Sequence, residues 1–138
     1  MAARLNPYIG FRNNAREALT FYHAIFGGEL SLMTFAESGM AEGPAQADNI
    51  MHGQLETPGG MVLMASDTPA SMPLVDGSNI SISLSGDDEA LLRRYWDELL
   101  TGGDAVMPLG KAPWGDTFGM LVDRFGVSWM VNIAGHRG

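Results

Sequence analysis

Apolar residues in the first half of the chain switch between the spacing of a strand and the spacing of a helix. An apolar run over 5–11 predicts a strand. Residues 15–26 repeat apolar side chains at helical spacing, with Asn13 or Asn14 as a candidate N-cap and the Gly27-Gly28 pair as a stop. Strand-like runs follow over 30–35, 49–57 and 61–66, and a loop of small residues is expected over 36–48.

The second half repeats this order of elements. Alternation over 79–84 predicts a strand, and residues 89–100 again carry apolar positions at helical spacing. Asp87 or Asp88 would cap this helix, and Gly102-Gly103 would end it. Strand-like runs then follow over 105–109, 118–123 and 127–133.

This repeat predicts an α+β fold made of two βαβββ modules. The modules would span 1–67 and 79–138, joined by a Pro- and Gly-containing linker over 68–78, within one structural domain. A helix on one face of each sheet would leave the other face free. Two curved mixed sheets side by side would then form a half-barrel around a groove.

Composition narrows the classes of partner. The 138 residues include 8 basic and 16 acidic side chains, a net charge of −8, which disfavours nucleic acid and anionic membrane surfaces. Cys is absent, which excludes disulfides and thiolate metal sites. No long apolar run or signal-like segment is present, so we expect a cytoplasmic protein that does not span a membrane.

Strand alternation selects the side chains that would line the groove. Ile50, His52, Gln54 and Glu56 share one strand face by this pattern, with three polar groups among them. A neutral His beside a carboxylate can act as a general base, which makes His52 and Glu56 candidate catalytic residues. A solvated sheet face is the structural alternative.

The remaining groove candidates are hydroxyls, amides, thioethers and three aromatic side chains. Trp114 lies on a Pro/Gly loop and is either a ligand platform or a plug that packs the loop onto the sheet, and Phe118 would extend an aromatic wall. The other candidates are Asn6, Tyr8, Met64, Ser66, Ser81, Ser83, Met130 and Asn132. The opposite strand faces are expected in the core: Leu5, Pro7, Ile9, Phe11, Val127, Trp129 and Val131.

The repeat and several motifs resemble the vicinal oxygen chelate superfamily of glyoxalases, bleomycin-resistance proteins and dioxygenases. Phe26-Gly27-Gly28, Ile50-Met51-His52, the LMASD run over 63–67 and the DRFGVSWMVN run over 123–132 look like its PhnB-like branch. The resemblance implies a homodimer, sometimes formed by exchange of modules. Members are often labelled 3-demethylubiquinone 3-methyltransferase, but this chain lacks a Gly-rich strand-to-helix turn with a downstream carboxylate for a methyl donor carrying an adenosyl group.

The superfamily's usual divalent metal takes His, Glu or Gln from the first and fourth strands of each module. By resemblance, these positions are Asn6, Met64, Ser81 and Met130. None is a good ligand for a hard divalent ion, and two thioethers would favour soft ions, if any. We therefore expect no metal and no cofactor.

Three functions follow as hypotheses. The first is a metal-free protein that binds or sequesters a small molecule in the groove. The second is a superfamily enzyme, a lyase, isomerase or glyoxalase-like protein, that uses His52 and Glu56 with an atypical metal or none. The third is a non-catalytic accessory partner of another protein.

Overall fold

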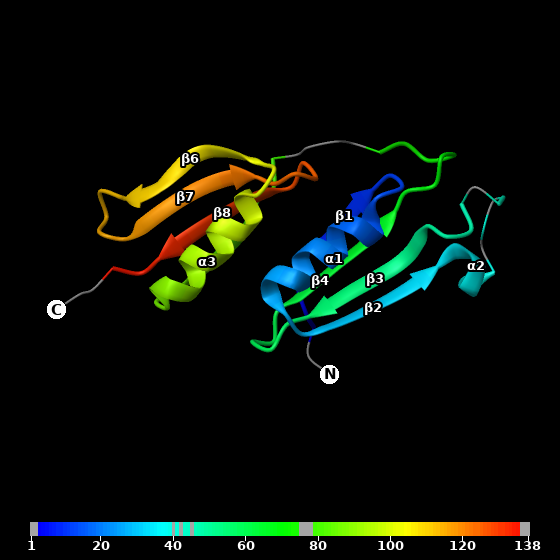
Figure 1. The fold of residues 1–138 in the computed structure, drawn as a ribbon, viewed down its shortest axis with the longest axis horizontal. Coiled ribbons are helices and arrows are strands. Elements are labelled where there is room, and N and C mark those ends of the chain that lie inside the picture. The colour runs from blue at the N-terminus through cyan, green and yellow to red at the C-terminus, as the bar shows by residue number, and fades with distance from the viewer. Residues whose placement is uncertain (1–2, 40, 42, 45, 75–78, 136–138) are drawn as a thin grey trace. The chain divides into compact units, whose positions relative to one another are not determined.

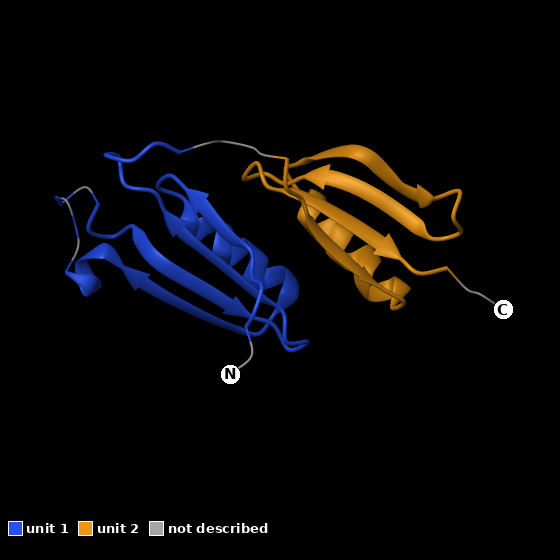
Figure 2. Cartoon of the chain, turned by 180° about the vertical axis from the view of Figure 1, so that it is seen from behind, with its two compact units in different colours: residues 1–74 blue, residues 75–138 orange. Residues whose placement is uncertain are grey.

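The repeat expected from the sequence is present as two copies of one topology. The computed structural model describes residues 3–39, 41, 43–44, 46–74 and 79–135. These residues divide into two compact units, 1–74 and 75–138 (Figure 2). Each unit contains one four-stranded mixed sheet and is described by itself below.

The first unit contains a sheet in the strand order β1-β4-β3-β2. The outer pair β1 and β4 is parallel, and the other neighbouring strands are antiparallel. Figure 1 shows helix α1 lying across one face of this sheet. The elements are β1 (Tyr8–Phe11), α1 (Ala15–Phe26), β2 (Glu29–Thr34), α2 (Phe35–Ser38), β3 (Ile50–Glu56) and β4 (Val62–Asp67).

The second unit has the same arrangement, with the order β5-β8-β7-β6 and a parallel pair β5–β8. Helix α3 lies across one face of its sheet (Figure 1). The elements are β5 (Ile82–Gly86), α3 (Glu89–Leu100), β6 (Asp104–Lys111), β7 (Thr117–Val122) and β8 (Ser128–Ile133). The α+β class and the duplicated βαβββ order are therefore confirmed, with both sheets open at their edges.

Each helix packs onto its sheet over a glycine in a central strand. A Cβ on Gly53 of β3 would collide with the Leu19 side chain of α1. In the second unit, a Cβ on Gly119 of β7 would lie 2.8 Å from the Trp96 ring of α3. The helices therefore cover the sheet faces on which Gly53 and Gly119 lie, and the opposite faces carry the alternate residues.

A buried aspartate joins the ends of two elements in the first unit. Asp67 is 3% exposed and accepts hydrogen bonds from the backbone N–H of Ala15 at 3.0 Å and of Ile50 at 2.9 Å. It thus bonds the first residue of α1, whereas Asn14 occupies the N-cap position without a side-chain bond. Helix α3 has the local cap expected from sequence, because Asp88 accepts from the N–H of Leu91 at 3.2 Å.

Three local expectations were wrong. Strand β1 begins at Tyr8, and Leu5 is fully exposed instead of lying in the core. Ile50 is fully buried because a register shift opposite Met33 and Thr34 in β2 breaks the alternation that grouped it with His52. The expected loop over 36–48 contains most of the short helix α2, which begins with a Thr34–Glu37 capping box.

None of the helices in the described part of the chain is long and apolar enough to cross a membrane.

Candidate functional site

The candidate residues of the first unit gather on the sheet face that α1 leaves uncovered, which we call open face 1. The strand register places Tyr8, Met64 and Gln54 side by side across β1, β4 and β3. Ser66 and His52 lie on the same face, two positions along their strands. Five side chains selected by sequence alternation therefore share one surface, with Glu56 further along β3.

Tyr8 and His52 are in contact on open face 1. The Tyr8 hydroxyl lies 3.4 Å from His52 Nδ1, and the two ring centroids are 5.9 Å apart. Tyr8 is 52% exposed and His52 is half-buried, so a ligand could reach both. Glu56 is four residues further along the strand, about 13 Å at 3.3 Å per residue, so the phenol and not the carboxylate is the group beside His52.

Open face 2, the uncovered face of the second sheet, is richer in thioethers. The register aligns Ser83, Met130, Met120 and Met107 across β5, β8, β7 and β6. The next row on this face places Phe118 beside Asn132. Ser83, Met130, Phe118 and Asn132 are thus brought together as expected from strand alternation.

Trp114 belongs to the same surface. Its ring contacts Phe118 edge-on, with centroids 5.7 Å apart and planes at 64°, and the residue is 58% exposed. The ring therefore packs against a strand residue and still presents area to solvent. Asn6 and Ser81 lie just before β1 and β5 and are half-buried, outside the strand rows.

Asp116 and Met107 are the residues of open face 2 that sequence reasoning missed. Asp116 accepts from Asn132 Nδ2 at 3.1 Å and from the N–H of Gly135 at 2.8 Å, and so fixes the Asn132 amide and the turn that carries Trp114. The position of Asp116, between a Pro/Gly loop and a strand, was the sequence signal that could have identified it. Met107 could not be found by alternation, because register shifts on both sides of it interrupt β6.

The side chains at the superfamily's metal positions do not suit a hard divalent ion. Of the four positions, Asn6, Met64, Ser81 and Met130, the two thioethers are paired with Tyr8 and Ser83, so Asn6 and Ser81 lie two residues before the positions opposite them. Within the described ranges, no group of three or more His, Cys, Asp or Glu side chains is close enough to hold a metal ion. The donor set therefore differs from the His, Glu and Gln ligands of that site.

One carboxyl group outside the open faces, that of Glu37, has a perturbed pKa. The pKa of Glu37 lies below its ordinary value because the backbone N–H and then the hydroxyl of Thr34 donate hydrogen bonds to it. Glu37 begins α2 and lies at the end of β2, so it stabilises a chain turn and not the candidate site.

Known proteins share the sequence and the fold of this chain. The chain is 27% identical over 143 residues to protein YjdN of Escherichia coli K12, with 94% of both chains covered. It is 40% identical to protein PA1353 of Pseudomonas aeruginosa, whose crystal structure superposes with a TM-score of 0.85 over 98% of this chain and all of that one. A PhnB protein from Bacillus cereus is 24% identical, with a TM-score of 0.72 over 96% of this chain and all of that one.

More distant structures show the fold alone. One is a glyoxylase/bleomycin resistance protein/dioxygenase domain from Frankia, 14% identical with a TM-score of 0.62 over 97% of this chain and 98% of that one. The family model described as 3-demethylubiquinone-9 3-methyltransferase matches residues 3–132, nearly the whole chain. The chain therefore belongs to this family, and its duplicated βαβββ units have the same fold as the glyoxylase/bleomycin resistance protein/dioxygenase domain.

Proposed function

We propose that this protein binds a small molecule on open faces 1 and 2 without the divalent metal of its superfamily, and that it holds the ligand rather than converting it. One observation carries the proposal. Each unit presents an exposed aromatic ring, Tyr8 or Trp114, beside polar and thioether side chains on the face its helix leaves uncovered. Aromatic area gives affinity, and nearby amides and hydroxyls fix orientation.

The side chains of both faces favour a ligand with an apolar, preferably aromatic, body and several hydrogen-bonding groups. Met64 and Met130 add flexible, polarizable surface that can adapt to different shapes. Gln54 and Asn132 supply both donors and acceptors. Neither open face is strongly cationic, so a polyanionic ligand is disfavoured.

A homodimer in the cytoplasm is part of this proposal. Apolar side chains outside the two helix-covered cores are unusually exposed, with Ile80 at 72% and Val106 at 63%. Burial against a second copy would remove them from water. Val106 lies on the edge strand β6, so Val106→Lys should weaken dimerisation in sedimentation velocity experiments.

The second candidate function is an enzyme of the superfamily. It is favoured by the Tyr8–His52 contact, which places a hydroxyl against an imidazole nitrogen that can accept a proton. His52 would act as the general base, with Glu56 as a second candidate catalytic residue further along the strand. The accessory role predicts instead that a partner protein covers these faces.

The methyltransferase description of the family does not by itself imply that this chain transfers a methyl group. A methyl donor with an adenosyl group is typically held at a Gly-rich turn between a strand and a helix. The β1–α1 turn is Arg12-Asn13-Asn14, and the β5–α3 turn continues from Gly86 into Asp87-Asp88. Neither turn has that glycine pattern.

The proposal is tested by binding of the aromatic probe 8-anilinonaphthalene-1-sulfonate, followed by its fluorescence. Tyr8→Ala and Trp114→Ala should each weaken probe binding several-fold, whereas Met72→Ala, at a 55% exposed position outside the strands of both sheets, should leave it unchanged. Equal binding by all variants would contradict the proposal. Loss of turnover of a screened substrate in His52→Ala, with probe binding intact, would favour the enzyme.

A further inference from the structure

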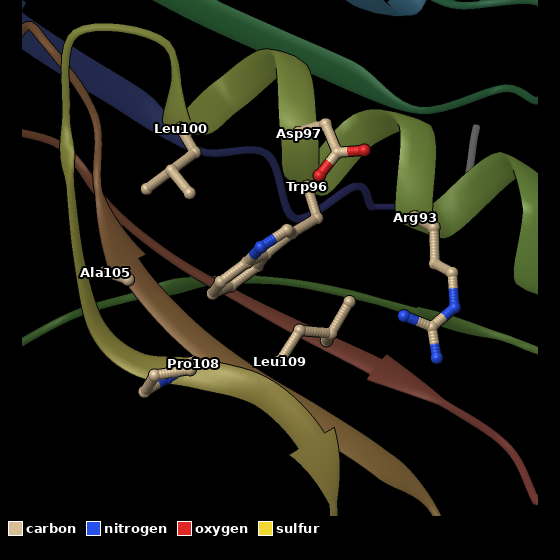
Figure 3. A pocket seen from close by; sticks show the side chains of 7 residues that line it. All are labelled: Arg93, Trp96, Asp97, Leu100, Ala105, Pro108 and Leu109. Atoms are coloured by element: carbon tan, nitrogen blue, oxygen red, sulfur yellow. The ribbon is translucent and has the colours of Figure 1, made fainter.

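A pocket of 310 Å³ lies between helix α3 and strand β6, on the side of the second sheet opposite open face 2 (Figure 3). It is lined by Trp96 and Leu100 of the helix and by Ala105 and Leu109 of the strand, with charged side chains at one side. The volume is at the lower end of the range for small-molecule sites. The pocket is separate from both open faces, because α3 covers the other face of the sheet.

Trp96 brings to the pocket a hydrogen-bond donor that has no partner among the described residues. Trp96 is only 5% exposed, yet no described residue accepts a hydrogen bond from its indole N–H. Trp129, the other buried tryptophan of this unit, donates its indole N–H to Asp123 at 2.9 Å. Buried indoles usually find such an acceptor. The Trp96 nitrogen is not fully enclosed and lies on the visible edge of the ring in Figure 3, so a ligand's acceptor can reach it.

Two opposite charges accompany this donor. Arg93 and Asp97 are one helical turn apart, where side chains are neighbours, and both line the pocket. They do not pair with each other, because Arg93 Nε bonds Glu89 Oε2 at 2.8 Å. The terminal guanidinium nitrogens and the Asp97 carboxylate have no hydrogen-bond partner among the described residues. A cation and an anion therefore remain available beside the apolar side chains of the pocket.

We propose that this pocket binds a free apolar α-amino acid. Its carboxylate would bond Arg93 and the Trp96 N–H, its ammonium group would bond Asp97, and its side chain would fill the space against Leu100 and Leu109. A zwitterion satisfies the donor and both charges at once, which neither a simple acid nor a simple amine does. This site is independent of the open faces and goes beyond the proposed function.

The experiment uses ¹⁵N-labelled protein and follows the indole N–H signal of Trp96, assigned by its loss in Trp96→Phe. The probes are L-phenylalanine, hydrocinnamate, which lacks the ammonium group, and phenethylamine, which lacks the carboxylate. L-phenylalanine should shift the Trp96 signal at millimolar concentration and bind about tenfold tighter than either analogue. The Trp114 and Trp129 signals of the same spectrum serve as internal references.

Substitutions at exposed positions assign the two charged contacts. Arg93→Gln should reduce L-phenylalanine binding to the level of phenethylamine, and Asp97→Asn should reduce it to the level of hydrocinnamate. Arg94→Gln is the matched control, because Arg94 is on the same helix, is similarly exposed and does not line the pocket. Circular dichroism verifies that each variant is folded.

Several outcomes would overturn the inference. They are an unmoved Trp96 signal with L-phenylalanine, equal binding of all three probes, or equal weakening by Arg93→Gln and Arg94→Gln. A Trp96 signal that moves with protein concentration and not with L-phenylalanine would assign the pocket to a second copy of the chain. A shift confined to Trp114 would assign binding to open face 2.

Discussion

The carboxylate of Asp123 accepts the indole N–H of Trp129 at 2.9 Å, and both residues are almost completely buried. The other oxygen of the same carboxylate accepts the backbone N–H of Phe125 at 2.8 Å and of Val127 at 3.0 Å. One side chain thus joins the β7–β8 turn to the core. Asp67 plays the corresponding part in the first unit, where it bonds the start of α1 and of β3.

Asp123→Ala is expected to destabilise the second unit by about 2–4 kcal/mol, because it leaves three donors unsatisfied in or near the core. Trp129→Phe removes only one of these bonds, with some packing area, and should cost less. The measurement is urea unfolding followed by circular dichroism. Trp114→Phe, at an exposed ring, is the control and should change the free energy of unfolding by less than about 0.5 kcal/mol. An Asp123→Ala variant as stable as this control would contradict the assigned role.

Gly53→Ala is expected to destabilise the first unit by about 1–3 kcal/mol through overpacking, because the new methyl group would meet the Leu19 side chain beneath α1. Gly59→Ala is the matched control, since a Cβ there meets nothing within 4 Å. In thermal unfolding, Gly53→Ala should lower the Tm and Gly59→Ala should not. If the clash is the cause, Gly53→Ala combined with Leu19→Ala will cost less than the sum of the two single changes.

The helices were the most predictable part of the fold. The predicted segments 15–26 and 89–100 agree with α1 and α3 at both ends, because the apolar stripe and the glycines that follow are local signals. The cap of α3 was equally local. The Asp67 bond to α1 comes from a residue 52 positions away and cannot be read from spacing.

The candidate site was predictable wherever strands are regular. Alternation brought His52, Gln54 and Met64 correctly onto one face, but it misplaced Ile50, because a bulge depends on pairing with a neighbouring strand. The Tyr8–His52 contact has the same origin, since β1 and β3 are both paired with β4 and the register decides which side chains meet. The periodicity of one strand predicts which sheet face a side chain occupies. The pairing register between strands is needed to predict which side chains touch on that face.

Metal analysis tests whether the thioethers of Met64 and Met130 leave the protein without a bound divalent metal. Protein purified without chelator after growth with added zinc, manganese, nickel and iron should contain far less than one metal ion per chain, because Met64 and Met130 are weak ligands for these ions. Inductively coupled plasma mass spectrometry provides the measurement. A stoichiometric metal that disappears in Met64→Leu or Met130→Leu, and persists in the exposed control Met72→Leu, would contradict the metal-free proposal.

The capping box at the start of α2 makes a pH-dependent prediction. Thr34 donates to Glu37 Oε1 from its backbone N–H at 3.1 Å and from its hydroxyl at 2.9 Å, which holds the pKa of Glu37 below its ordinary value of 4.5. The charged carboxylate is the form that accepts these bonds. Its stabilising contribution is therefore present above the ordinary pKa and is lost as the pH falls through the lowered pKa.

An NMR titration of the Glu37 carboxyl and the Thr34 amide will measure that lowered pKa directly. Thr34→Val removes the hydroxyl donor and keeps the backbone donor, so the pKa of Glu37 should rise only part of the way to its ordinary value, since the backbone bond is the larger cause. Thr101→Val is the control, because its hydroxyl donates to the Asp97 carbonyl in the other unit. A wild-type Glu37 that titrates at or above 4.5 would show that the capping box does not hold in solution.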